Sequence, residues 1–203
     1  MSVRVHRKNH TIITTVILCL TYLLLTAFYY HIDKNLTGIT FALCNMLIVV
    51  SFLLIVFRGL KALFYLLRNY QNVTPYLITG GLVCLLTLAY SILSPYQFNS
   101  EQLESEVVLR ACYEGTQNQS YVKFRKSKAF EMNWTGVFGY DEWWTGNWRR
   151  SGDTLFLKYD NKKIKQFGDT IVIANGYLNP LHQVTGKQTP KQLFYLGFCR
   201  HEN

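Results

Sequence analysis

The densest group of side chains with recognition chemistry lies between residues 140 and 150, in the stretch YDEWWTGNWRR. It combines indole rings, which stack on planar groups, with guanidinium ions, which pair with phosphates. This combination predicts a platform for a nucleotide or another phosphate-bearing ligand. We include Arg125, a basic residue further upstream in the sequence, in this predicted site. The predicted ligand-binding residues are Trp143, Trp144, Trp148, Arg149, Arg150 and Arg125.

The same tryptophans also have a purely structural interpretation. At strand spacing, Trp144 and Trp148 share one face while Trp143 points to the other. One ring then fills the core of a small β domain, and the others cover its rim or touch a membrane interface. This interpretation is favoured, because aromatic side chains dominate the cores of small β domains.

Catalytic motifs are absent from the sequence. The chain has no G-x-S-x-G, no H-E-x-x-H, no P-loop and no G-x-G-x-x-G. Asp141 and Glu142 adjoin, so on a strand their carboxylates face opposite ways and make a poor acid–base pair. His182 and His201 fall outside the predicted strands. We therefore expect a non-enzymatic protein that uses no cofactor.

Two cysteines carry information about the cellular compartment. No C-x-x-C or Cys/His spacing occurs, so no metal site is expected. Cys112 and Cys199 would lie on the first and last strands of the C-terminal domain, and these strands are neighbours in a closed barrel. On an oxidising side of the membrane the two would form a disulfide, whereas in the cytosol both would stay buried thiols.

The region that must position these residues has the pattern of a β domain. Beyond residue 106, apolar and polar residues alternate with a period of two, and Gly, Asn and Asp separate the runs. With no helical segment among them, these runs indicate a small barrel or sandwich of six to eight strands. Of these two we expect a small all-β antiparallel barrel over residues 107–203. Residues 101–106 form a linker to it.

Residues 1–100 are predicted to be a transmembrane helical region. Uncharged stretches cover residues 11–30, 36–57 and 75–93, each close to the roughly 20 residues that cross a bilayer. Residues 58–70, RGLKALFYLLRNY, are amphipathic. They either extend the second stretch, lie in the interface or form a fourth crossing. The expected fold is therefore three α-helical spans, or four, followed by the barrel.

The charge distribution orients these spans. The net charge is +9, and residues 1–100 hold seven Lys and Arg against the single acid Asp33. Basic membrane flanks explain most of this excess, so direct binding of nucleic acid is not expected.

Lys and Arg number three before the first stretch, one after it, three after the second and none from 71 to 109. The positive-inside rule then predicts an inner-membrane protein with a cytoplasmic N-terminus. Three spans place the C-terminal domain outside, and four place it inside.

Three stretches of the C-terminal half, SYVKFRKSKAFEMNWTG, TGNWRRSGDTLFLKYD and NGYLNPL, share a pattern of Gly-x-Trp and Gly-Asp-Thr hairpins over residues 112–181. This pattern resembles that of small lipocalin-like domains of Bacteroidota membrane proteins. The size and span number also resemble the membrane accessory proteins of type VI-B CRISPR loci. The architecture resembles the β-barrel membrane effectors of CBASS systems.

These resemblances imply a non-enzymatic accessory or effector of prokaryotic antiviral defence. Its spans would form a homo-oligomer that perturbs the bilayer or modulates a partner nuclease, and its barrel would sense a cyclic nucleotide or a protein partner. The alternative is a lipocalin-like binding module anchored in the periplasm, without a defence role. A fold resemblance by itself does not transfer function.

Overall fold

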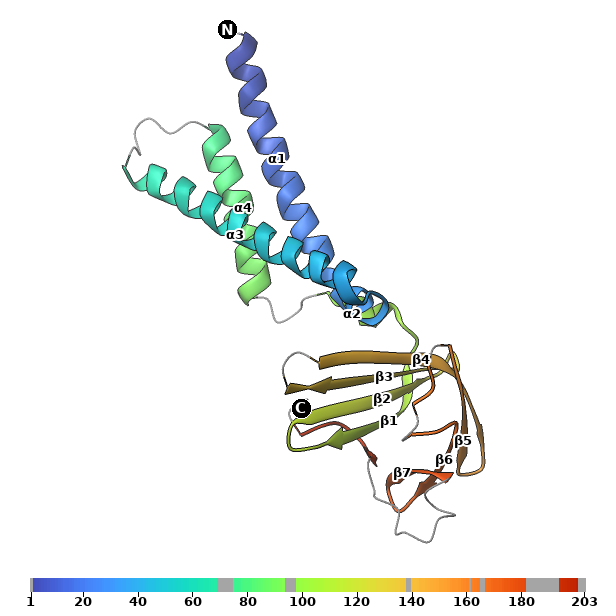
Figure 1. Cartoon of the computed structure of the whole chain (residues 1–203). Helices are drawn as coiled ribbons and strands as arrows, with labels where there is room; N and C mark the ends of the chain where they lie inside the picture. The colour runs from blue at the N-terminus through green and yellow to red at the C-terminus, as the bar shows by residue number, and fades with distance from the viewer. Residues whose placement is uncertain are drawn as a thin grey trace. The chain divides into compact units, whose positions relative to one another are not determined.

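The computed structural model describes residues 2–68, 75–93, 98–137, 140–160, 162–164, 167–181 and 194–200. The chain divides into two compact units, Met1–Leu103 and Glu104–Asn203. The first is helical and the second is a β barrel (Figure 1). Each unit is described by itself.

The helical unit begins with two helices that meet at a bend. Helix α1 covers Ser2–Ala27 and α2 covers Tyr29–Asn35, with a bend of 60° between Thr11–Ala27 and Tyr29–Asn35. The predicted stretch at residues 11–30 is therefore not one straight helix, because the helix breaks at Phe28, whose backbone has φ −96° and ψ 12°.

A long helix and a shorter apolar helix follow. Helix α3 runs over Gly38–Arg68, starting at a glycine with φ +60°, and α4 covers Pro75–Leu93 with proline at its first position. A 3-10 turn, η2, at Ser100–Leu103 ends the unit. Because α3 is continuous through Arg68, the described part of the amphipathic segment 58–70 extends the second stretch and is not a separate crossing.

Length and composition support fewer crossings than the sequence patterns predicted. Among the described residues, α3 is long and apolar enough to span a membrane, and a second span is obtained only if the bent pair of α1 and α2 counts as one. The described apolar part of α4, Ile78–Leu93, is shorter. Its 16 residues rise about 24 Å, less than the roughly 30 Å of a hydrocarbon core. Three or four spans do not follow from these criteria.

Small side chains lie where α3 and α4 pack together. A Cβ placed on Gly81 would lie 2.6 Å from the Cβ of Ala62, and one placed on Gly59 would lie 3.6 Å from the Cβ of Cys84. Many large apolar side chains point outward: Phe57, for example, is 65% exposed, whereas Ile55 and Tyr22 are buried in an apolar cluster of the helical unit. Small residues at a helix contact, together with exposed large apolar side chains, are typical of helices that pack within lipid.

The second unit is a closed barrel of eight antiparallel strands, each paired with the next, and β8 paired with β1. Eight strands lie within the predicted range, and the predicted all-β antiparallel barrel is confirmed. The strands are β1 Val107–Glu114, β2 Asn118–Arg125, β3 Ala129–Gly136, β4 Tyr140–Ser151, β5 Thr154–Tyr159, β6 Thr170–Ala174, β7 Tyr177–Pro180 and β8 Phe194–Leu196.

Alternating apolar residues fill the interior of the barrel. Val122 and Phe124 of β2 face inward with Phe130 and Met132 of β3, and each is at most 1% exposed. The tight fit explains the glycine at position 146 in β4. A Cβ there would lie 2.7 Å from the Phe130 ring and 2.2 Å from the carbonyl oxygen of Lys158. The middle of the barrel is therefore packed with side chains.

The close approach of α3 and α4 gives a prediction in which neighbouring glycines respond in opposite ways. Gly81→Ala should lower the stability of the helical unit by about 1–3 kcal/mol, because the new methyl group overpacks against Ala62. A Cβ on Gly80 meets nothing within 4 Å, so Gly80→Ala should be neutral or stabilising, by up to about 1 kcal/mol. Thermal unfolding in detergent, followed by far-UV circular dichroism, measures both.

A compensating change tests the contact directly. Adding Ala62→Gly to Gly81→Ala removes the opposing methyl group and should recover most of the lost stability. Equal effects of Gly80→Ala and Gly81→Ala, or no recovery in the double variant, would contradict this packing.

Candidate binding pocket in the barrel

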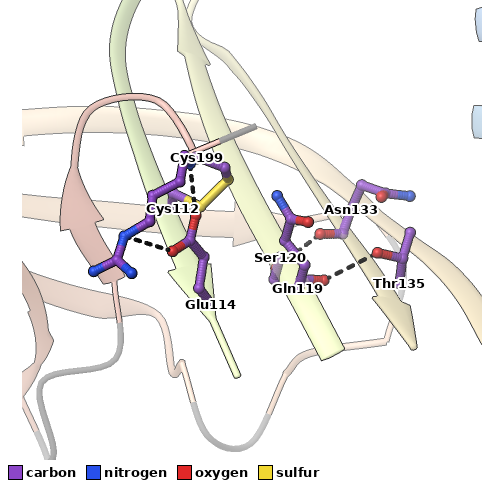
Figure 2. Close-up of a disulfide and its surroundings, with 8 residues drawn as sticks. Cys112, Glu114, Gln119, Ser120, Asn133, Thr135 and Cys199 are labelled. Carbon is purple, nitrogen blue, oxygen red and sulfur yellow. Dashed lines mark hydrogen bonds and ion pairs between the residues drawn. A yellow bond between two sulfur atoms is a disulfide. The ribbon is translucent and has the colours of Figure 1, made fainter. Parts of the chain in front are cut away.

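A disulfide joins the two ends of the barrel chain. Cys112 lies in β1, and Cys199 lies just beyond β8, not within it; their Cα atoms are 5.4 Å apart and both residues are fully buried. Figure 2 shows the bond beside β1 and β2. The backbone N–H of Arg200 donates to the Glu114 carboxylate at 2.6 Å and holds the same end of the chain.

The disulfide belongs to a cluster of residue types that could bind a metal ion. The sulfur atoms of Cys112 and Cys199 and a carboxylate oxygen of Glu114 lie within 4.8 Å of one another, which would suit a metal ion. A cysteine binds a metal ion as its thiolate, and here the disulfide uses both sulfur atoms. The bonded pair therefore serves to close the barrel.

The three predicted tryptophans of β4 do not form one platform. Trp144 and Trp148 belong to the core and are 9% and 7% exposed. Trp148 packs edge-on against Phe124 and donates its indole N–H to the carbonyl oxygen of Arg125 at 3.0 Å. Trp143 lies half-buried on the opposite face, edge-on to Tyr121. The alternation expected from strand spacing thus separates Trp143 from the other two.

The predicted arginines are also placed apart. Arg149 is exposed with its guanidinium over the Phe156 ring. Arg150 is exposed and donates to the carbonyl oxygen of Gly152 at 2.7 Å. Arg125 is 3% exposed, donating through Nε to Glu131 at 3.0 Å and through an Nη atom to the carbonyl oxygen of Ser105 at 2.7 Å.

The pairing of Arg125 makes it a structural residue. An external phosphate that drew the guanidinium away would break its buried ion pair with Glu131, which is 1% exposed. Breaking a buried pair in this way costs about 3–5 kcal/mol, more than one surface contact returns. The structure thus does not bring the six predicted residues into one site, and His182 and His201 lie outside the described residues.

A pocket of about 510 Å³ opens instead where β3 ends and β4 begins. It holds Trp144, the only one of the predicted ligand-binding residues among its lining residues. The lining residues are Trp134, Tyr140, Glu142, Trp144, Lys162, Lys163 and Ile164.

Strand register explains how these residues come together. Trp134 of β3 pairs directly with Glu142 of β4, and Gly136 pairs with Tyr140. Tyr140, Glu142 and Trp144 alternate along β4, so they lie on the face that continues into the core. Exposure falls from Tyr140 through Glu142 to the buried Trp144. The pocket is thus the mouth of a barrel whose interior is filled below it.

Hydrogen bonding and charge define the chemistry of this mouth. The Tyr140 hydroxyl donates to the Glu142 carboxylate, and this bond raises the pKa of Tyr140 above its usual value. Lys163 pairs with Asp169 at 2.5 Å, which holds the pKa of the Asp169 carboxyl below its usual range. Because Lys163 is paired with Asp169, the charges that remain among the three aromatic rings are the carboxylate of Glu142 and the ammonium group of Lys162.

The sequence contained a signal for this pocket that motif reasoning missed. Trp134 and Tyr140 flank a reversal marked by Gly136 and Gly139. A hairpin there pairs the residues before the reversal with those after it. Counting outward from that turn would have paired Trp134 with Glu142.

Neither a protein-family model, nor a curated protein, nor a solved structure matches this chain. The pocket and the disulfide must therefore be interpreted from their own geometry.

Breaking the disulfide should destabilise the barrel. Joining residues 87 positions apart restricts the unfolded chain by about 4–5 kcal/mol in the chain-entropy model. We expect Cys112→Ser with Cys199→Ser to lower the free energy of unfolding by up to that amount. All four tryptophans lie within residues 107–203, so their fluorescence during denaturant unfolding reports on the barrel alone.

Cys44→Ser is the matched control, because Cys44 is a free cysteine of α3. It should leave the tryptophan unfolding curve unchanged. An unchanged curve for the double serine variant would show that the bond does not stabilise the barrel.

Proposed function

We propose that this chain is a membrane-anchored binding protein. Its helical unit crosses the inner membrane, and its barrel presents the mouth pocket on the oxidising side. The observation that carries the proposal is the pocket itself, in which Trp134, Tyr140 and Trp144 line the same space as Glu142. Ligand sites of proteins are typically concave, combine apolar and aromatic walls with placed polar groups, and have a volume of about 300–1,000 Å³. The walls here are three aromatic rings, Ile164 and three charged side chains.

The packing of the helical unit supports three crossings. Helices α1, α3 and α4 all contact one another, so the neighbours of α3 would enter the bilayer with it. Large apolar side chains cover the outer faces of α1 and α4, as Leu24 at 58% exposed and Leu86 at 60% exposed illustrate. The buried positions include small or polar residues such as Ser51 and Thr87, beside the larger Ile55. A bilayer would hide this apolar surface, and water would not.

Charge and the disulfide support the side on which the barrel lies. Arg58 of α3 donates to the Thr15 hydroxyl of α1 at 3.1 Å, which brings the basic part of α3 near the basic N-terminal end of α1. The positive-inside rule favours a cytoplasmic location for that end. After three crossings the barrel would then face the oxidising side, where the Cys112–Cys199 bond is stable.

The mouth pocket suits a small amphipathic ligand with a flat apolar body and a cationic group. Aromatic faces attract cations, and a neighbouring carboxylate strengthens that preference. A phosphate-rich ligand suits it less, since Glu142 would repel it and, of the two lysines that line the pocket, Lys163 is already paired with Asp169.

Two indole compounds test the ligand class on the full chain in lipid nanodiscs. Saturation-transfer NMR should detect binding of tryptamine, a cation, in preference to indole-3-acetate, an anion. Trp134→Ala should weaken tryptamine binding about tenfold or more, because aromatic anchors carry much of the energy of a binding site. Trp143→Ala is the matched control, since its ring lies on the opposite face, and it should leave binding unchanged. Equal loss in both variants, or no tryptamine signal, would contradict the proposed pocket.

The role in antiviral defence stays a prediction. A barrel that senses a cytoplasmic cyclic nucleotide must lie in the cytoplasm, and the disulfide favours the other side. Co-expression with a nucleotide-signalling enzyme or an RNA-guided nuclease tests this role: growth arrest or altered interference would support it, and no effect would favour the anchored binding protein.

A further inference from the structure

A second cavity lies inside the helical unit. Its volume is about 400 Å³, and it lies between α1, α3 and α4. Polar and small residues on its walls are Thr11 and Thr15 of α1, Arg58 and Lys61 of α3, and Gly80 and Gly81 of α4. A Cβ on Gly80 would meet nothing within 4 Å, so the absence of a side chain there leaves the cavity open.

One cation of this cavity is held in place by a neighbouring helix. Arg58 is half-buried, and one of its Nη atoms donates to the Thr15 hydroxyl at 3.1 Å. A guanidinium has five N–H donors in a fixed fork, so this bond orients the group and leaves other donors for an anion. Lys61 is exposed one turn further along α3 and lines the same space.

The helices offer no acidic partner for these cations. Neither α1, α3 nor α4 contains Asp or Glu, and the acids of unit Met1–Leu103 are Asp33 and Glu101. Asp33 follows the C-terminal end of α1, which lies about 18 Å along the helix from Thr15 at 1.5 Å per residue. Two cations in a partly apolar cavity without acids on its walls favour an anion from outside the protein.

The apolar walls indicate what kind of anion this is. Leu54 and Phe57 line the cavity, and they are 44% and 65% exposed, so an apolar surface continues from the cationic group along α3. A free inorganic anion would gain nothing from that surface. The headgroup and acyl chains of a lipid would contact both parts, and basic pockets between transmembrane helices bind anionic headgroups in this way.

We propose that the cavity between α1, α3 and α4 binds an anionic phospholipid, with Arg58 and Lys61 contacting the headgroup phosphate and Leu54 and Phe57 contacting its acyl chains. This inference rests on the proposed membrane insertion of the helical unit. Thr15 is a positioning residue, since it orients the Arg58 guanidinium and need not touch the lipid.

Native mass spectrometry of the full chain in detergent tests the site. The probes are phosphatidylglycerol and phosphatidylcholine with identical acyl chains. The wild type should retain phosphatidylglycerol about tenfold better, and Arg58→Gln with Lys61→Gln should abolish the preference. Arg68→Gln with Lys34→Gln removes the same charge outside the cavity, so this control should keep it. Gly80→Leu fills the cavity without changing any charge and should also abolish retention.

The results that would contradict the lipid site can be told apart from those that would contradict membrane insertion. Retention of both lipids alike, or an unchanged preference in the Arg58 and Lys61 double variant, would overturn the proposal. Displacement of phosphatidylglycerol by millimolar inorganic phosphate would show that a free anion is the ligand and would overturn it too. Extraction of membranes with alkaline carbonate examines membrane insertion separately. Release of the chain would contradict both proposals, whereas a retained chain without lipid preference would contradict the lipid site alone.

Discussion

Closure of the barrel is the constraint on which the C-terminal unit depends. In the part of the chain that the structure describes, the last strand, β8, is three residues long, and its pairing with β1 has two registered positions, Ala111 with Leu196 and Cys112 with Tyr195. So short a ladder holds weakly, and an open edge would leave β1 unpaired. The bond between Cys112 and Cys199 lies at this seam, where it adds a covalent link to a few backbone hydrogen bonds. The rest of the barrel, including its packed interior and mouth pocket, relies on that seam.

The helical unit depends on a different constraint, the close approach of backbones. Small residues lie at the contact of α3 with α4, and many large apolar side chains point outward, while Ile55 and Tyr22 form part of a buried apolar cluster. In lipid, the hydrophobic effect does not drive helices together, so close packing and occasional polar contacts must do so. The hydrogen bond from Arg58 to Thr15 is one such contact. The Arg58 guanidinium also lines the cavity that we propose binds a lipid.

Alternation and charge predicted much of this architecture. A period of two in the runs that became β2, β3 and β5 was enough to predict an antiparallel β domain, either a barrel or a sandwich, because half-buried strands must alternate. The second uncharged stretch appeared as the long helix α3. The first stretch was less predictable, since nothing in its composition marks the break at Phe28. The crossing number does not follow from the uncharged stretches alone, because α1 and α2 count as a span only as a bent pair and the described apolar part of α4 is shorter than a span.

The binding site was harder to predict than the fold. Proximity in sequence made residues 143–150 look like one platform, yet a strand sends successive side chains to opposite faces and buries Trp144 and Trp148. The mouth pocket instead joins Trp134 to Glu142 across a hairpin. Such cross-strand neighbours are visible only after the register is fixed, and the register depends on the turn. Arg125 is a charged example: its ion pair with Glu131 joins β2 to β3, so it too is visible only after the register is fixed.

The central claim is that the barrel faces the oxidising side of the membrane, and the state of its cysteines in living cells tests it most directly. Cells expressing the unmodified chain are quenched in acid, alkylated with a light reagent, reduced and alkylated with a heavy one, and the peptides are identified by mass spectrometry. The account predicts heavy label on Cys112 and Cys199, with light label on Cys19, Cys44 and Cys84, which form no disulfide. Light label on Cys112 and Cys199 would contradict the account, because both thiols would then be free in the cell.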